Sequence, residues 1–444
     1  MSTDFITLTT EESGGSHYVT VAASVAAAGA VAGAAIAYGG WLGAAGVLVG
    51  TLLLRWPVQV ALGSFALLLP FDSISSLGAE ATGTALTRYA GACAAVVLLA
   101  VGLATRRLSV PPRAALWWSM FVLWGVATMG WAINSQFAWE RLPTALSLLL
   151  LYVIATAFRI TEKEMSAVLL LTVLGGCAAA AMASYQFYSG TVYMQTSRSS
   201  LMMGNRDTDP NQFAASLLLP LSLAIGAVVV GRRKSIRIAA AAAIATLSLA
   251  ILLSMSRGAL VAALALIVVY MCRLGVNRRI LVATACLAAL LLVMPQSFFT
   301  RLTLNDRGAG RFDIWSASMD LVPSYGLFGA GWNNFVVVYT DIAGHASTFR
   351  GYTKGSHNIY VGMLVEVGIV GLTFLLLAFR SQLREARSRL LIPYEAACWA
   401  MLVMGFTLDI VWRKSFWFAW ILLAMAVRMR SQRMRTHDDA EVRA

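Results

Sequence analysis

Residues 165–188 read MSAVLLLTVLGGCAAAAMASYQFY, a run without a charged side chain. An α-helix rises about 1.5 Å per residue, so a run of this length can cross the roughly 30 Å hydrocarbon core of a membrane. A helix also satisfies its own backbone hydrogen bonds, as a chain in contact with lipid must. This stretch therefore predicts a transmembrane helix.

Similar runs fill most of the 444 residues, of which 59% are hydrophobic and 12% charged, with a mean hydropathy of +0.73. Soluble domains are roughly half apolar and a quarter charged, so a soluble protein is excluded. We predict an all-α polytopic membrane protein with about 12 to 14 transmembrane helices, the range arising because the second and third runs are short. The candidate spans are Tyr18 to Gly39, Trp41 to Leu54, Pro57 to Phe71, Tyr89 to Thr105, Ala115 to Ile133, Thr144 to Phe158, Met165 to Tyr188, Gln212 to Val230, Ile238 to Met255, Gly258 to Cys272, Ile280 to Pro295, His357 to Phe379, Leu391 to Val411 and Phe416 to Val427.

Basic residues indicate the orientation, because they are retained on the cytoplasmic side. Most of the 34 lysines and arginines fall in alternate short loops, which predicts that both termini are cytoplasmic. The net charge of +13 follows from this topology, and no basic amphipathic face indicates a nucleic acid partner. We expect several tryptophans near span ends to be interfacial anchors, namely Trp117, Trp118, Trp131, Trp139, Trp412, Trp417 and Trp420.

The spans and loops divide the chain into four regions. Residues 1–295 hold N-terminal spans with short loops, and residues 296–356 form a large loop on the side away from the cytoplasm. C-terminal spans follow over 357–430, and 431–444 form a cytoplasmic tail. A loop of this length is usually functional or disordered, and its apolar and aromatic content argues against disorder.

The large loop contains a glycine-rich basic segment in which Arg307 and Arg311 flank Gly308-Ala309-Gly310. A glycine-rich turn that leads into a helix exposes backbone N–H groups, and with the two arginines it would suit an anion such as a phosphate. The competing interpretation is a helix on the membrane surface with solvated arginines. The residues leave both open.

Arg257 interrupts the apolar stretch 251–266. An arginine at membrane depth costs roughly 2.5 to 3.5 kcal/mol on insertion scales and usually faces a cavity or an anionic partner. It could equally reach the outer interface from a helical hairpin. The sequence does not separate these two interpretations.

His357 opens the span that follows the large loop, three residues before Tyr360, so the two share a helix face at the membrane boundary. A neutral imidazole there could take a proton from an acceptor hydroxyl. A structural role for a lone interfacial histidine is the competing interpretation.

The segment Asp207-Thr208-Asp209-Pro210 resembles an Asp-x-Asp metal-binding pair. We favour an N-cap instead, because Asp209 directly precedes a proline at the first position of a predicted helix. The five cysteines lie within apolar runs without metal-ligand spacing. We expect no metal and no other cofactor, and the chain has no P-loop or hydrolase motif.

Several motifs together resemble the bacterial O-antigen ligase and polymerase superfamily. Each is weak alone, but their order is fairly specific, and the match spans Gly204 to about Leu376. The motifs are Asp209-Pro210-Asn211-Gln212-Phe213-Ala214, Ser256-Arg257-Gly258-Ala259, Gly310-Arg311-x-x-Ile314-Trp315, Pro323 to Gly331, His357-Asn358-x-Tyr360, and Glu366-x-Gly368-x-x-Gly371.

The resemblance implies an inverting, metal-independent membrane glycosyltransferase of the C type (GT-C) in the bacterial inner membrane, with its active site on the periplasmic face. It would move O-antigen polysaccharide from undecaprenyl diphosphate to a hydroxyl of lipid A-core during lipopolysaccharide biosynthesis, in contact with membrane lipids. By position, the catalytic residues would be His357 as base, with Arg257 and Arg311 on the diphosphate. Further donor-binding residues would be Arg206, Arg307, Asn358 and Tyr360.

Alternatives remain open at this point. An O-antigen polymerase would take a second lipid-linked glycan as acceptor, and a protein O-oligosaccharyltransferase of the same superfamily would take a protein hydroxyl. A non-enzymatic transporter of lipid-linked glycans is the competing class. It predicts a charged path through the bilayer, whereas the spans contain few acids and almost no bases.

Overall fold

The computed structural model describes the backbone of residues 50–74, 76–77, 84–191, 198–203, 206–231, 233–275, 296, 299–300, 311–345 and 355–443. The spans predicted at 18–39 and 280–295, and most of the span at 41–54, lie outside the described residues.

The described part of the chain is built almost entirely of helices. Its strands are two pairs of two residues each, β1 with β2 and β3 with β4, both antiparallel. In chain order the elements are α3 (Pro57–Leu68), η1 (Leu69–Phe71), β1 (Ser76–Leu77), β2 (Thr84–Ala85), α4 (Leu86–Ala104), α5 (Arg113–Thr128), η2 (Met129–Trp131), α6 (Ser135–Ala157), α7 (Glu162–Tyr188), β3 (Met202–Met203), β4 (Arg206–Asp207), α8 (Pro210–Ser216), α9 (Leu218–Val230), α10 (Lys234–Leu253), α11 (Arg257–Leu274), α14 (Arg311–Met319), α15 (Val322–Tyr325), α16 (Phe335–His345), α17 (Ile359–Glu385), η5 (Arg389–Leu391), α18 (Ile392–Met404) and α19 (Lys414–Arg443).

Within these residues, eight helical segments are long and apolar enough to cross a membrane. They correspond to α4, α5 with η2, α6, α7, α8 with α9, α10, α11 and α17. The shorter helices α3 and α18 and the start of α19 coincide with three further predicted spans. The all-α polytopic class is confirmed, while a total of about twelve crossings remains a prediction.

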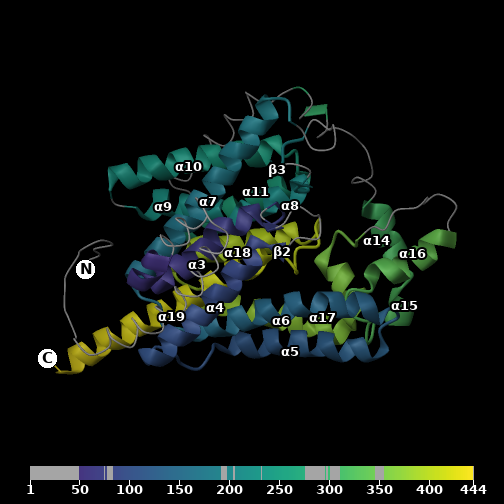
Figure 1. Ribbon diagram of the computed structural model, residues 1–444, viewed down its shortest axis with the longest axis horizontal. Helices are drawn as coiled ribbons and strands as arrows, with labels where there is room; N and C mark the ends of the chain where they lie inside the picture. The colour runs from purple at the N-terminus through teal and green to yellow at the C-terminus, as the bar shows by residue number, and fades with distance from the viewer. Residues whose placement is uncertain are drawn as a thin grey trace.

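The helices run between two ends of the molecule. The C-terminus lies at the left of Figure 1, and α14, α15 and α16 lie at the right, where we define the loop end. The opposite end, which we call the basic end, carries an ion pair between Arg107 and Glu164 and another between Arg273 and Glu395. The sequence-based topology likewise separated the basic short loops from the large loop.

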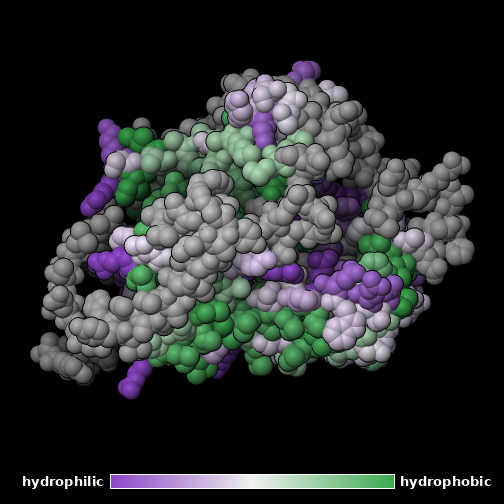
Figure 2. Space-filling model, in the orientation of Figure 1, coloured by the Kyte–Doolittle hydropathy of each residue, from purple (hydrophilic) through white to green (hydrophobic). Residues whose placement is uncertain are grey.

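The surface over α5 and α6, at the bottom of Figure 2, is largely apolar, whereas hydrophilic residues gather near α14 to α16. Leu116 and Leu123 of α5 and Leu150 of α6 are each more than half exposed. Apolar side chains at such exposure are expected where helices face lipid tails.

Several tryptophans expected to be interfacial anchors belong instead to the core. Trp118, Trp417 and Trp420 are fully buried. The rings of Trp118 and Trp417 lie 4.4 Å apart between centroids, and Phe379 stacks on Trp420 at 4.9 Å. The anchor prediction is wrong for these three, because distance along the sequence from a span end does not reveal which face of the helix a ring occupies.

Candidate active site

The segment between α18 and α19, residues 405–413, lies at the loop end, and we call it the central turn. The Ile359 N–H at the start of α17 donates to the Gly405 carbonyl at 2.8 Å. Gly258 in α11 approaches so closely that a Cβ at this position would lie 2.1 Å from Thr407 Oγ1. The N-terminal ends of α11 and α17 therefore meet on either side of the central turn.

Arg257 occupies the first position of α11, directly beside the glycine that contacts the central turn. Helix α10 ends at Leu253, and the Ser256 hydroxyl caps α11 by accepting the Ala259 N–H at 3.3 Å. The arginine thus lies at a turn between two spans rather than in the middle of one. Of the two interpretations that the sequence left open, the structure favours the hairpin.

His357 lies two residues before the start of α17 and has a left-handed backbone, with φ of 49°, so it does not share a helix face with Tyr360 as predicted. Such a conformation is unfavourable for residues other than glycine and is often found at functional sites. Asn358 caps α17, because its side-chain oxygen accepts the N–H groups of Tyr360 at 2.9 Å and Val361 at 3.2 Å. The Tyr360 hydroxyl donates to the Leu402 carbonyl at 3.0 Å. These contacts fix the backbone on which His357 is placed.

Arg311 begins α14, the helix predicted after the glycine-rich segment. The Trp315 indole N–H, four residues later, donates to the carbonyl of Ser356 at 3.1 Å, and Ser356 is the neighbour of His357. Residues four apart share a helix face, so Arg311 lies one turn from this contact and on the same side. The fold thereby brings the start of α14 to the start of α17.

The apolar face of helix α14 packs against other helices of the protein. Ile314 is buried in a small core with Leu321, Phe335, Val338, Tyr339 and Val365. The helix itself was predicted correctly, but its apolar face packs on α16 and α17.

The other predicted site residues either lie outside the described residues or have structural roles. Arg307 and the glycine-rich turn lie outside the described residues, as does the side chain of Arg206. Asp209 caps α8 by accepting the N–H groups of Asn211 at 2.9 Å and Gln212 at 3.1 Å, as predicted. Within the described part of the chain, no three His, Cys, Asp or Glu side chains are grouped as metal ligands would be.

A second glycine-rich segment, residues 326–331 before α16, packs against a kink in α17. The kink is at Gly368, with φ of 65°. The Glu366 carboxylate accepts the N–H groups of Asn333 at 3.1 Å and Phe335 at 3.4 Å. The Glu366 carbonyl accepts the Gly331 N–H at 3.0 Å. An acidic residue at membrane depth is thereby explained as the anchor of this segment.

Arg141 of α6 points to the same place. Its guanidinium donates two hydrogen bonds to Asn333 Oδ1, at 3.3 and 3.2 Å, and lies 5.8 Å from the centroid of the Trp412 ring. Asp409 on the central turn is nearby: burial raises its pKa, whereas the guanidinium groups of Arg141 and Arg413 lower it. Glu366 thus positions Arg141 through Asn333.

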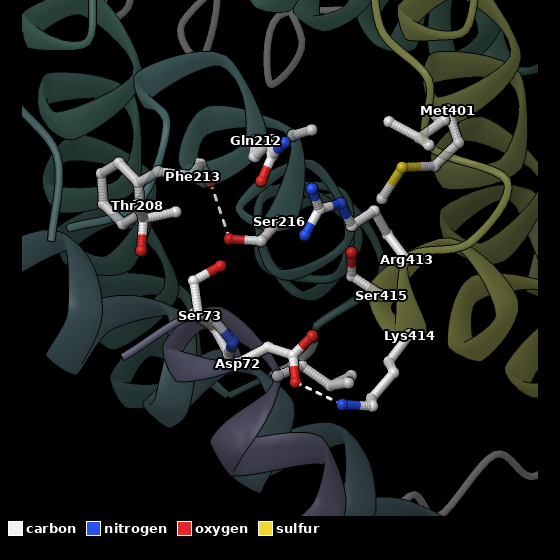
Figure 3. Close-up of a pocket in the computed structure, with 14 residues that line it drawn as sticks. Asp72, Ser73, Thr208, Gln212, Phe213, Ser216, Met401, Arg413, Lys414 and Ser415 are labelled. Atoms are coloured by element: carbon white, nitrogen blue, oxygen red, sulfur yellow. Dashed lines mark hydrogen bonds and ion pairs between the residues drawn. The ribbon is translucent and has the colours of Figure 1, made fainter. Parts of the chain in front are cut away.

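The sequence analysis did not single out Arg141, Arg413 or Lys414. Lys414 forms an ion pair with Asp72 beside η1 (Figure 3). It also donates to Thr87 Oγ1 at 2.7 Å. The predicted topology could have identified them, because these three cations are among the few predicted on the side away from the cytoplasmic loops. Counting the charges in the loops predicts this side, but it does not predict that segments distant in the sequence come together.

Fold and site together define a multi-pass helical membrane protein with arginines and a histidine gathered around one turn at one end. Residues 240–376 match the family model described as O-antigen ligase. This match confirms the resemblance and supports membership of the O-antigen ligase and polymerase superfamily, whose members are glycosyltransferase-like enzymes. Among curated proteins, none matches the chain.

Proposed function

We propose that the protein is an inverting, metal-independent glycosyltransferase that moves O-antigen polysaccharide from undecaprenyl diphosphate to a hydroxyl of lipid A-core, on the periplasmic face of the inner membrane. The observation that carries this proposal is the convergence of Arg257, Arg311 and His357 around the central turn. These residues come from three segments that are far apart in the sequence. The matched family supports a lipid-linked glycan as substrate.

In the proposed reaction, the acceptor oxygen attacks the anomeric carbon as the bond to the diphosphate oxygen breaks. His357 takes the proton of the acceptor hydroxyl. Arg257 and Arg311 stabilise the charge that develops on the leaving diphosphate, since preorganised cations act most strongly where charge forms. Arg206 and Arg307 are assigned to the donor on the basis of the motif resemblance alone.

The left-handed backbone of His357 supports this assignment. Asn358 and Tyr360 hold the chain on its C-terminal side, and Trp315 binds the Ser356 carbonyl on its N-terminal side. A side chain restrained in this way loses little freedom when substrates bind. We therefore assign Asn358 and Tyr360 mainly to positioning the base, although the resemblance places them among the donor-binding residues.

The proposal is tested by reconstituting the protein with undecaprenyl diphosphate-linked glycan and purified lipid A-core. We expect glycosylated lipid A-core, and we expect His357→Ala to lower its rate by about 10²- to 10⁴-fold, the usual contribution of a general base. Donor loading should persist in this variant. His437→Ala, in the tail at the opposite end, is the matched control.

The other outcomes separate the alternatives. Donor chains that lengthen without modification of lipid A-core would indicate a polymerase. A transporter would retain its activity in the His357→Ala variant, because no proton transfer is needed. Loss of activity with EDTA, restored by Mg²⁺ or Mn²⁺, would contradict metal independence.

A further inference from the structure

A small cavity beside the central turn is separate from the convergence of Arg257, Arg311 and His357. It lies between η1, α8, α18 and the start of α19, as Figure 3 shows. Its volume is about 30 Å³, enough for roughly two water-sized groups, since one water needs about 10 to 15 Å³ by the same measure. The cavity can therefore hold a small polar head group but not a sugar ring.

The polar wall of the cavity carries two cations, Arg413 and Lys414. Lys414 is paired with Asp72. Within the described part of the chain, the Arg413 guanidinium makes no hydrogen bond or ion pair, and in Figure 3 it points toward Gln212 and Ser216. An arginine remains charged in proteins, so this group retains an unmet need for an acceptor.

The nearby carboxylates do not meet that need. Asp72 is engaged by Lys414 and Asp209 by the amides that it caps, whereas Asp409 of the central turn acts on Arg413 through its charge but forms no ion pair with it in the described structure. Burial lowers the pKa of Arg413, and so does Arg141, whereas Asp72, Asp409 and Asp209 raise it from a distance. The charge of Arg413 is thus desolvated and only partly compensated, which is expensive unless a ligand supplies an anion.

A second polar group in the same wall is unsatisfied. Thr208 is 4% exposed, and its Oγ1 has no hydrogen-bond partner in the described structure. A buried hydroxyl without a partner loses its hydration without replacement, so such groups are rare in stable folds. The cavity therefore presents two potential donors, a guanidinium and a hydroxyl, neither of which is bound to an acceptor in the described structure.

Part of the wall is apolar, with Leu69, Met401 and Ile410. A wall of this kind beside two donors suits a ligand with an anionic head and an apolar chain. An inorganic anion would use only the donors.

We propose that this cavity is a second anion site, which binds the phosphate head group of a membrane lipid through Arg413 and Thr208. The assignment does not depend on the transfer reaction, because it uses Thr208 before α8 and Arg413 at the end of the central turn rather than the starts of α11, α14 and α17. A free phosphate shares the head-group chemistry, and the experiment below distinguishes the two sources.

The test is titration calorimetry of the full-length protein in an uncharged detergent. The probes are farnesyl phosphate, its neutral analogue farnesol, and inorganic phosphate. The Arg257→Gln background removes a contribution from the proposed donor site, so that failure here is distinct from failure of the transferase proposal. We expect farnesyl phosphate to bind, and farnesol to bind at least tenfold more weakly.

Two variants test the donors. Arg413→Gln should weaken binding of farnesyl phosphate by about tenfold or more, because it removes a charge-assisted contact, and Thr208→Val by about fivefold. Arg387→Gln removes the same charge from an exposed position near the basic end and should leave binding unchanged. If Arg413→Gln fails to fold, Arg413→Lys and Thr208→Val remain informative, since both keep the local volume.

Inorganic phosphate that binds as tightly as farnesyl phosphate would support an anion site for a free ion rather than a lipid. Unchanged affinity in both Arg413→Gln and Thr208→Val would overturn the proposal. So would the absence of measurable binding of either phosphate.

Discussion

Glu366 illustrates how a residue that looks costly in sequence becomes necessary in the fold. It is one of few acids within the candidate spans, and it is 5% exposed. Both carboxylate oxygens accept backbone N–H groups from the segment that holds Asn333. Because Asn333 also binds Arg141, one carboxylate sets the position of a cation near the central turn.

We predict that Glu366→Gln destabilises the protein. One carboxylate oxygen would become an NH₂ group facing a backbone N–H donor, at a cost of about 1 to 3 kcal/mol. The measurement is thermal unfolding in detergent, followed by tryptophan fluorescence. Glu385→Gln, at the exposed end of the same helix, is the control, and equal melting temperatures for both variants would contradict the anchoring role.

Asp209 supports a second prediction at this scale. Asp209→Asn keeps an oxygen that can cap α8, so stability and transfer should be largely retained, whereas Asp209→Ala should cost about 1 kcal/mol of stability. Unfolding curves of the two variants, with and without EDTA, provide the comparison. A large loss of activity in Asp209→Asn together with sensitivity to EDTA would revive a metal role.

Among the elements, α17 depends most on a single backbone conformation. Its kink at Gly368 opens the helix where residues from the large loop pack, and a Cβ at this position would lie 2.3 Å from the Leu327 carbonyl oxygen. The Trp124 indole N–H of α5 donates to the Val367 carbonyl at 2.8 Å and helps to satisfy the interrupted helix. A kink of this type therefore serves as a docking point.

We predict that Gly368→Ala lowers stability more than Gly190→Ala does. Both glycines have positive φ, 65° and 86°, so both variants incur backbone strain of about 1 to 3 kcal/mol. Among the described residues no atom lies within 4 Å of a Cβ at Gly190, so only Gly368→Ala adds a steric clash there. The difference between the two melting temperatures isolates the docking contact, and no difference would argue against it.

Helix boundaries show where hydropathy is sufficient and where it is not. The span predicted from Met165 to Tyr188 ends where α7 ends, and Thr161 forms a capping box with Glu164 at its start. In contrast, α6 begins at Ser135, well before the predicted Thr144, because Asn134 caps it and its first turns include charged residues. Apolar runs mark the membrane-crossing part of a helix, whereas caps determine its full length.

At the scale of the whole molecule, the separation of the loop end from the basic end predicts the sidedness of chemical labelling. Single cysteines are introduced at Ser324 of α15 and at Arg387 after α17, both exposed, in a background without the native cysteines. A membrane-impermeant maleimide should label position 324 in intact spheroplasts and position 387 only after lysis. The reverse pattern would place the proposed active site in the cytoplasm.

The amino-acid sequence by itself determined the class of protein and the positions of most described spans, and it predicts the side on which the unusual polar residues fall. These properties follow from local quantities, namely the length of apolar runs and the distribution of positive charge. The order of the motifs was also sufficient to indicate the superfamily that the family match supports.

Only the tertiary structure decided which of those residues meet. Arg257, Arg311 and His357 converge because Gly258 packs on Thr407 and Trp315 binds the carbonyl before His357. Arg413 and Thr208 line one cavity because the segments that precede α19 and α8 meet there. Helix packing depends on the shapes of distant surfaces, which no local pattern of hydropathy or charge encodes.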